Sequence, residues 1–385
     1  MWSDRTTLAA CALFVVSCAV AYGGLFSHAY PGDVGTYAIY GRALVLDGRI
    51  PYRDFYDEYP PGSVGVFALP VLLWNAHYVL TFKLLMTACG IGFVACAAWT
   101  LRRLGLSRLR LVPIVLAPAL LGPVFLNRYD PVPALVTSLA LVAVLRGRGR
   151  AGGGLLGVGT ALKLYPLAAV PVVVRRLRDR TGAAAAFAAA VAVLVLPFVA
   201  LAPGGVGFSF KSQLERHLEI ESVGASILLA LSKLRVHHVG YVARSSIDVG
   251  GGLADAVGVA TSVLLVLLVA LVVWTYLRGP DDDARLVTAV AAVVAAVVTF
   301  AKVLSPQYLT WLVPLVPLAA GRKGAYAAGA FLVSLALTQP EYIVDKYGLR
   351  AQNWTVWALV LRNAALVATF GFLLAQLREG LRRPA

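Results

Sequence analysis

The sequence is a series of long apolar runs separated by short polar gaps, and this pattern restricts the chain to a membrane-embedded helical fold. A helix that crosses a bilayer needs ~20 apolar residues, and several runs reach that length. Hydrophobic residues make up 59% of the chain and charged residues 14%, the reverse of a solvated globular surface. No gap is long and polar enough for a soluble nucleotide-binding domain. We therefore expect one all-α, polytopic integral membrane domain over residues 1–385.

The apolar runs predict about ten full membrane spans. Some of the runs are shorter than a straight span requires, so their edges are loosely defined. The predicted spans are 8–27, 79–101, 109–126, 131–146, 181–202, 253–277, 285–304, 307–320, 324–339 and 354–377.

The distribution of charge predicts the orientation. The net charge of +15 is spread over short loops rather than gathered on a soluble face, so it does not indicate a nucleic-acid partner. Basic residues in short loops mark the cytoplasmic side of a membrane protein. Both termini are thus expected in the cytoplasm, and the two longest loops, 28–62 and 203–252, on the outer face. The predicted cytoplasmic segments are Arg5, Arg102 to Arg110, Arg146 to Arg150, Arg175 to Arg180, Arg278 to Arg285, Arg322 with Lys323, and Arg378 to Arg383.

Two apolar segments do not fit as single spans. Residues 151–174 have basic clusters on both sides, and the sequence KLYP at 163–166 interrupts this apolar run. Proline disfavours the helical conformation of the residue before it, which predicts two half-length helices in a re-entrant hairpin with Lys163 near its tip. Residues 62–76 follow a pair of prolines and are too short to span, which predicts a re-entrant or interfacial helix.

The sequence indicates neither a disulfide framework nor a cofactor. The four cysteines lie within apolar runs, where cysteine commonly acts as a small hydrophobe. No spacing of His, Asp and Glu suggests a metal site, so we expect basic side chains to supply positive charge. GVGTAL at 157–162 lacks the Lys and Ser/Thr of a phosphate-binding loop.

Carboxylates concentrate in the polar segment that follows the first span. Asp33 comes first, and Asp54, Asp57 and Glu58 form a second cluster. Charged groups beside lipid are costly unless water or a ligand solvates them, so this loop is a candidate site for chemistry. The alternative role for Asp33 is to cap a helix that starts at Val34, since Asp caps well. For the second cluster, a solvated or arginine-paired surface role is the favoured alternative.

Several motifs follow one another along the chain, and their order and spacing are more specific than any one of them. They are GDVGTY at 32–37, PY and YPPG at 51–62, NRYDPVPAL at 127–135, LLGVGTALKLYPLAAVPVV at 155–173, HLEIES at 217–222 and LSPQYLTWLVPL at 304–315. With these motifs the chain resembles an actinobacterial membrane glycosyltransferase of the C-type superfamily, close to glycosyltransferase family 87. Some relatives carry a histidine shortly after the Ser-Pro pair, but Leu309, Thr310 and Trp311 follow Tyr308 here.

The resemblance implies an enzyme of the cell envelope that acts at the outer face of the cytoplasmic membrane. The chain is similar to enzymes that move mannose from a polyprenyl-phosphate donor to a hydroxyl of a lipid or glycan acceptor. The resemblance places the catalytic aspartate at Asp33, as the base that takes the acceptor proton. Membrane lipids are the surrounding partner, and no nucleic acid is expected.

The departing phosphate requires positive charge, and four residues are candidates to bind it: Lys163, Lys302, Arg128 and His217. A lysine within an apolar run is costly unless it is paired, although it can also extend to the interface. Arg128 and Asp130 are close enough in sequence to pair with each other, and His217 lies beside Arg216 on an amphipathic stretch that also suits an interfacial helix. Tyr59, Tyr308 and Gln307 are candidates for contact with the sugar or the acceptor.

Two alternative functions remain open. An arabinofuranosyltransferase would use the same fold with a different donor sugar. A transporter or flippase of a lipid-linked sugar should show internal repeats and interrupted helices in matching halves. The single hairpin and the carboxylates gathered in one loop favour the enzyme.

Overall fold

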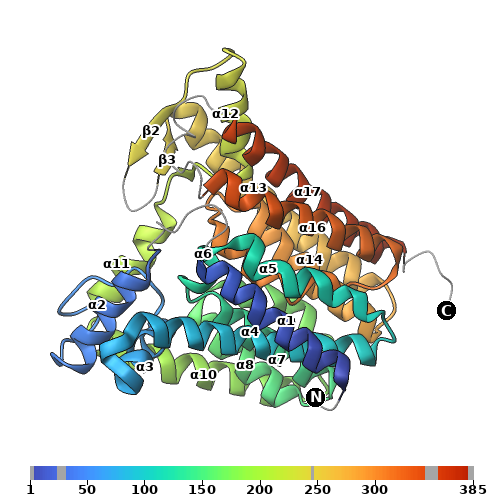
Figure 1. The fold of residues 1–385 in the computed structure, drawn as a ribbon, viewed down its shortest axis with the longest axis horizontal. Helices are drawn as coiled ribbons and strands as arrows, with labels where there is room; N and C mark the ends of the chain where they lie inside the picture. Colours follow the sequence, from blue (N-terminus) through green and yellow to red (C-terminus); the bar gives the residue numbers. More distant parts are fainter. Residues whose placement is uncertain (1–3, 24–31, 244–246, 343–353, 380–385) are drawn as a thin grey trace.

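The fold is almost entirely helical in the computed structural model, which describes residues 4–23, 32–243, 247–342 and 354–379. Long helices pack side by side, and a small sheet lies at the end of the molecule away from the N-terminus (Figure 1). The α-helices are α1 (Arg5–Gly23), α2 (Val34–Val45), α3 (Val64–Trp74), α4 (Tyr78–Arg103), α5 (Val112–Leu121), α6 (Pro123–Leu126), α7 (Pro131–Leu145), α8 (Gly149–Leu162), α9 (Val170–Val174), α10 (Arg180–Leu201), α11 (Pro203–Leu214), α12 (Val223–Lys233), α13 (Gly252–Arg278), α14 (Asp283–Phe300), α15 (Leu309–Leu312), α16 (Gly321–Tyr342) and α17 (Thr355–Glu379).

The predicted all-α membrane fold is confirmed, and this is a multi-pass membrane protein. Six helical segments within the described residues are long and apolar enough to cross a membrane. They are Arg5–Tyr22, Pro61–Arg103, Arg180–Leu201, Gly252–Arg278, Asp283–Phe300 and Thr355–Glu379.

Two of the predicted spans are not single helices. The run 109–126 breaks at Gly122, whose φ of +61° ends α5 before α6 begins. The run 307–320 forms only short helical pieces, because Pro306 and Pro317 each begin a new turn and prevent one continuous helix.

The hairpin predicted for 151–174 is present. Helix α8 ends at Leu162, Lys163 is extended with φ −160° and ψ 138°, and η4 (Tyr165–Ala169) and α9 follow. The two flanks of the hairpin meet, since Arg150 Nε lies 2.6 Å from Asp179 Oδ2. The chain therefore leaves from and returns to the same end, with Lys163 at the other.

Helix α8 packs closely against α10 through small residues. The Cα atoms of Gly153 and Gly157 face the Ala183 and Phe187 backbone so closely that a Cβ would overlap it. This small-xxx-small spacing brings membrane helices together. Most of the surface of α10 is not covered by other helices, because Ala183 is the only one of its 22 residues that is buried. Its apolar surface is therefore the surface expected to meet lipid.

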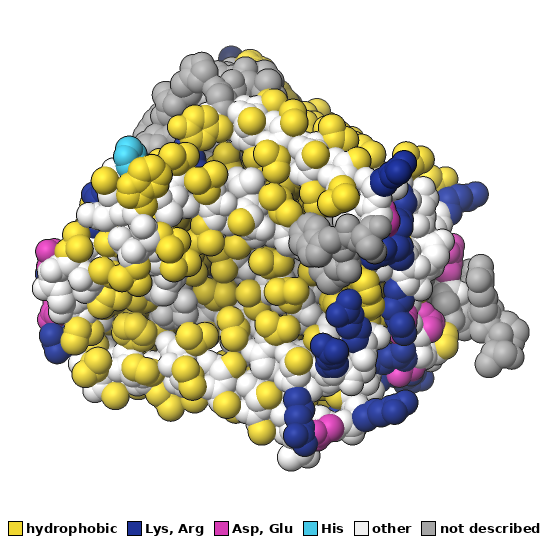
Figure 2. All heavy atoms as spheres, turned by 60° about the horizontal axis from the view of Figure 1, so that its bottom comes forward, with side chains coloured by type: hydrophobic (Ala, Val, Ile, Leu, Met, Phe, Trp, Pro, Cys, Tyr) yellow, Lys and Arg dark blue, Asp and Glu magenta, His cyan; other side chains and the backbone are white. Residues whose placement is uncertain are grey.

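Many Lys and Arg side chains gather at one end of the face that Figure 2 shows, beside a broad hydrophobic surface. Ion pairs and hydrogen bonds link the predicted cytoplasmic segments into one network. The contacts are Asp4 with Arg102 and Arg108, Arg103 and Arg176 with Asp283, Arg150 with Asp179, Lys323 with Glu379, Arg110 with the Gly321 carbonyl, and Arg285 with the Leu377 carbonyl.

The loop 203–252 contains a small antiparallel sheet that the sequence did not predict. Strands β1 (Leu218–Glu219), β2 (Gly240–Ala243) and β3 (Ile247–Gly250) lie in the order β1-β3-β2. Leu218 pairs with Val249, and Tyr241 pairs with Val249 from the other side. The interfacial helix considered for the stretch around His217 is wrong, because α11 ends at Leu214 and a strand follows.

Candidate active site

Asp33 occupies the position before α2 but does not cap the helix. Its side chain makes no capping hydrogen bond. The Tyr59 hydroxyl instead donates to Asp33 Oδ2 at 2.6 Å, and Arg128 forms an ion pair with the same oxygen. Within the part of the chain that the structure describes, Oδ1 accepts no hydrogen bond, and the side chain is 26% exposed. One carboxylate oxygen is thus held in place and the other is available to accept a proton.

Lys163 is held at the hairpin tip by a second carboxylate. Its Nζ lies 3.1 Å from Asp130 Oδ1, and the Trp311 indole donates to that oxygen at 2.7 Å. Three rings surround the ammonium group, with centroids at 4.6 Å for Tyr129, 5.2 Å for Tyr308 and 5.5 Å for Trp311. The lysine therefore does not extend to the interface.

The pair expected between Arg128 and Asp130 is wrong. Arg128 pairs with Asp33, and Asp130 pairs with Lys163. The two residues flank Tyr129 just before α7 begins at Pro131, and the turn there sends their side chains to different partners. Helix α7 thus begins with two ion pairs, one on each side of Tyr129.

Aromatic rings connect the two ion pairs. The Tyr59 ring lies 5.6 Å from the Tyr129 ring, edge to face, and Tyr129 contacts Lys163. The Tyr129 hydroxyl donates to the Leu162 carbonyl at 3.0 Å, which fixes the ring beside the break in the hairpin. Asp33 and Lys163 therefore belong to one continuous cluster, although they are 130 positions apart in the sequence.

Asp54 and Asp57, in the acidic cluster of the predicted first outer loop, lie in different environments. Asp54 is on the surface, where the hydrogen bond from Arg53 lowers its pKa to about 2, and the surface role is confirmed for it. Asp57 is fully buried, so a solvated role is wrong for it; burial raises its pKa to about 7. Its Oδ1 accepts from the Tyr59 amide at 2.9 Å, and Oδ2 is buried without a hydrogen-bond partner among the described residues. The Glu58 carbonyl accepts from Gln213 of α11 at 3.4 Å.

The remaining candidates lie at different distances from this cluster. Tyr308 stacks on Trp311 with ring centroids 4.3 Å apart, and Gln307 beside it is buried. Lys302 donates to the Leu214 carbonyl at 2.7 Å, so it binds the end of α11. His217 faces Asp255 of α13 across 3.4 Å. The structure therefore brings Tyr308 to Lys163 but gives Lys302 and His217 other partners.

A buried charged cluster under the small sheet was missed by the sequence analysis. Arg362, deep in α17, forms an ion pair with Glu221 at 3.0 Å and also binds the Glu221 carbonyl at 2.7 Å. Glu219 Oε2 accepts from the Leu304 amide at 3.0 Å. The signals in the sequence were the motif HLEIES at 217–222 and an arginine within an apolar run. This cluster fixes the sheet to the segment that carries Tyr308.

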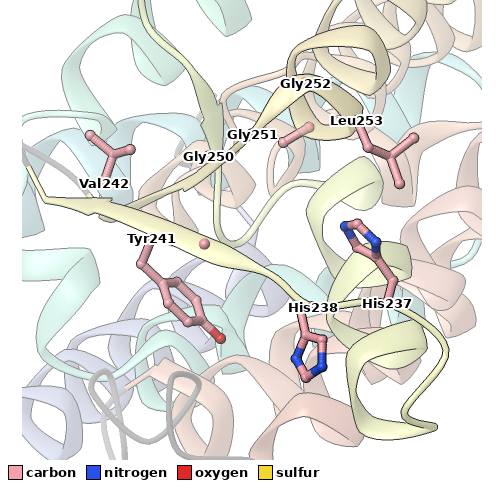
Figure 3. Close-up of a pocket in the computed structure, with 10 residues that line it drawn as sticks. His237, His238, Tyr241, Val242, Gly250, Gly251, Gly252 and Leu253 are labelled. Carbon is pink, nitrogen blue, oxygen red and sulfur yellow. The ribbon is translucent and has the colours of Figure 1, made fainter.

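A separate hollow of about 420 Å³ lies between strands β2 and β3 and the start of α13. Figure 3 shows His237, His238 and Tyr241 along one side and Gly250 to Leu253 along the other. None of the candidate residues lines it. In the described ranges, no group of three or more His, Cys, Asp or Glu side chains could hold a metal ion, and metal independence stays a prediction.

Comparisons with known proteins agree on one class. A family model described as "Glycosyltransferase family 87" matches residues 58–306, and one described as "Mannosyltransferase (PIG-M)" matches residues 237–378. A crystal structure of ArnT from Cupriavidus metallidurans bound to undecaprenyl phosphate is similar in fold, with a TM-score of 0.52 and 16% identity over 98% of this chain and 78% of that chain. No curated protein matches the sequence. Asp33 lies before the first matched segment, so its role depends on geometry.

Proposed function

Since this chain belongs to glycosyltransferase family 87 and is a multi-pass membrane glycosyltransferase, we propose that it transfers mannose from a polyprenyl-phosphate donor to a hydroxyl of a lipid or glycan acceptor. The match to a mannosyltransferase family over residues 237–378 supports mannose as the sugar. The similar ArnT structure holds undecaprenyl phosphate, which supports a donor of that class.

The observation that carries the proposal is the cluster of Asp33, Tyr59, Tyr129 and Lys163. It combines a carboxylate that has one available oxygen and is bound by Tyr59 with a cation that lies over Tyr129, and the two rings contact each other. Glycosyl transfer from a phosphate needs both, since a proton must leave the acceptor and negative charge develops on the leaving group.

The proposed step is a displacement at the anomeric carbon through an oxocarbenium-like transition state. The acceptor oxygen forms a bond to that carbon as the bond to the phosphate oxygen breaks. Asp33 Oδ1 accepts the hydroxyl proton, and the bond electrons leave with polyprenyl phosphate. Arg128 and Tyr59 hold Oδ2 and so keep the carboxylate aimed during the step.

Lys163 supplies positive charge beside the departing phosphate. In the structure its charge is matched by Asp130, which is 1% exposed. A phosphate that approaches Lys163 past the side chains of Tyr308 and Trp311 would share the ammonium group with Asp130. The surrounding low-dielectric site strengthens this interaction relative to water.

The site is proposed to face the outer side of the cytoplasmic membrane. Asp33 precedes α2 and Asp57 follows it, while the basic segments form a network at the other end of the hairpin. The positive-inside rule supports a cytoplasmic position for that network and an outer position for the candidate site.

The test is incubation of the purified protein with polyprenyl-phosphate mannose and candidate lipid acceptors, followed by analysis of the products. Transfer of mannose with release of polyprenyl phosphate is expected. Transfer only from a polyprenyl-phosphate arabinofuranose donor would replace mannose in the proposal. Movement of a lipid-linked sugar across liposomes, with no transfer to any acceptor, would contradict the enzyme and support a flippase.

A further inference from the structure

The basic residues already considered for phosphate binding have partners. Arg128 is paired with Asp33, and Lys163 is paired with Asp130. Lys302 donates to the carbonyl of Leu214. Each would have to share or give up an existing contact to bind a phosphate.

Arg216 differs from them in having no such partner. No hydrogen bond or ion pair joins it to any residue that the structure describes, and its Nε is buried without a partner there. A buried guanidinium nitrogen without an acceptor is costly, and a ligand that supplies one removes the cost. Arg216 was noted in the sequence only as the neighbour of His217.

The backbone on both sides of Arg216 is fixed. On one side, Lys302 Nζ binds the Leu214 carbonyl at 2.7 Å. On the other, the Glu219 amide donates to the Lys302 carbonyl at 3.0 Å. The side chain is therefore presented from a short, anchored connection between α11 and β1.

Contacts on both sides of Arg216 place it beside the candidate active site. Gln213 donates to the carbonyl of Glu58, next to Tyr59, at 3.4 Å, and Glu219 Oε2 accepts from the Leu304 amide, in the segment that leads to Tyr308, at 3.0 Å. Burial alone lowers the pKa of the guanidinium, but Tyr308, Glu219, Asp248 and Glu58 reverse this effect and raise the pKa overall. Tyr308 also contacts Lys163, with its ring centroid 5.2 Å from the ammonium group. Lys163 contacts Tyr308 directly, and the neighbours of Arg216 in the chain contact the segment that leads to Tyr308.

The buried carboxylates beneath the sheet have contacts other than Arg216. Glu219 Oε2 accepts a hydrogen bond from the Leu304 amide at 3.0 Å. Glu221 is paired with Arg362. Neither carboxylate is hydrogen-bonded to Arg216 among the described residues, so the guanidinium retains donors for an anionic ligand.

We propose that Arg216 binds the phosphate of the polyprenyl-phosphate donor. A guanidinium suits this role because its planar fork donates two parallel hydrogen bonds to phosphate oxygens. This role depends on the proposed function, since a phosphate is present only if the donor is of that class.

The test compares the binding of undecaprenyl phosphate with that of undecaprenol, which lacks the phosphate. Arg216→Gln should weaken binding of undecaprenyl phosphate by about 10- to 100-fold and leave binding of undecaprenol unchanged, because a charge-assisted contact is lost. Arg216→Lys should retain part of the difference. Lys211→Gln is the matched control, since it removes an exposed charge from α11 that pairs only with Glu215 among the described residues.

The outcomes separate this inference from the proposed function. If the wild type does not prefer undecaprenyl phosphate to undecaprenol, the proposed donor class fails, and the role of Arg216 fails with it. If the wild type shows the preference and Arg216→Gln retains it, only the role of Arg216 is overturned.

A purely structural role has its own signature. If Arg216 served only as a counter-charge for Glu219, Arg216→Gln would lower the melting temperature, and Arg216→Gln with Glu219→Gln would restore both stability and phosphate binding. We expect the double variant to remain unable to distinguish undecaprenyl phosphate from undecaprenol. Recovery of the preference in the double variant would overturn the proposal.

Discussion

The sequence allows Asp33 to be a helix cap or a catalytic base, and the contacts of its side chain exclude the cap. Asp before an apolar helix is a good cap, but Asp33 directs its carboxylate to Tyr59 and Arg128. The partners come from positions 59 and 128, so no local pattern predicts them. The capping alternative is therefore excluded by the contacts themselves, and the catalytic role stays a prediction.

Asp33→Asn separates catalysis from folding. The amide keeps the shape of the side chain and can still accept from Tyr59, but it cannot take up a proton. We expect turnover to fall by ~10²–10⁴-fold, the usual contribution of a general base, while donor binding is retained. Steady-state kinetics of the purified variant measure this.

The control is Asp54→Asn, which removes an exposed carboxylate of the same loop and should leave turnover near normal. Near-normal turnover in folded Asp33→Asn would direct the search for the base to Asp57 and Glu58.

Lys163→Ala should lower turnover by ~10²–10³-fold, because charge on the departing phosphate would develop without its cation in a low-dielectric site. The variant also leaves the buried Asp130 without its counter-charge, so its melting temperature should fall. Lys163→Ala with Asp130→Asn should recover the melting temperature but not the turnover. Recovery of both would reduce Lys163 to a structural partner of Asp130.

Asp57 predicts a pH dependence of stability. Its pKa is about 7 in the folded protein and 3.8 in an ordinary aspartate, so the folded state binds the proton more tightly. The stabilisation is therefore complete below about pH 4 and is lost as the pH rises through 7. The loss is at most roughly 4 kcal/mol for a shift of this size.

Melting temperatures at pH 5 and pH 8 test this for the wild type and Asp57→Asn. The wild type should lose more stability than the variant as the pH rises, and Asp54→Asn should follow the wild type. An equal fall in the wild type and Asp57→Asn would show that other groups cause the pH dependence.

At the scale of elements, the contact between α8 and α10 gives a sharp test of packing. A Cβ at Gly157 would overlap the Phe187 carbonyl oxygen, whereas one at Gly154 would lie 3.8 Å from the Ala186 Cβ. Gly157→Ala should therefore cost about 1–3 kcal/mol, as overpacking commonly does, and Gly154→Ala should be nearly neutral. Thermal unfolding in detergent measures both. Equal stability of the two variants would mean that the helices separate without cost.

Whether an element was predictable depended on its length and on the kind of signal it carries. The long helices α1, α4, α10, α13 and α17 follow from runs of apolar residues. The hairpin followed from charge on both flanks and a proline at 166. The sheet was missed because strands of two to four residues show no alternation that stands out from a loop.

The candidate site was predictable as a list of residues but not as a set of pairs. The rings of Tyr59 and Tyr129 connect Asp33 with Lys163, and no pattern in the sequence predicts the contact between these two rings. The burial of Asp57 was unpredictable for the same reason, since the same loop exposes Asp54 three residues earlier.

At the scale of the molecule, the basic network predicts the topology. Residues 148 and 178 flank the hairpin, and the pair Arg150–Asp179 holds those flanks together. Single cysteines at both positions, in a protein without Cys11, Cys18, Cys89 and Cys96, should resist a membrane-impermeant thiol reagent added from outside. Tyr56→Cys, at an exposed position of the first outer loop, should react. Labelling of 148 or 178 alone would contradict the hairpin.

The ion pair between Arg362 and Glu221 sets an order of assembly. The two residues are 141 positions apart, and a ribosome makes Glu221 long before it makes α17. Until α17 enters the membrane, the sheet lacks the arginine that neutralises its buried carboxylate. A nascent chain therefore contains Asp33 and Lys163 early, but the contacts that hold the sheet against the segment carrying Tyr308 are complete only after α17 has been made.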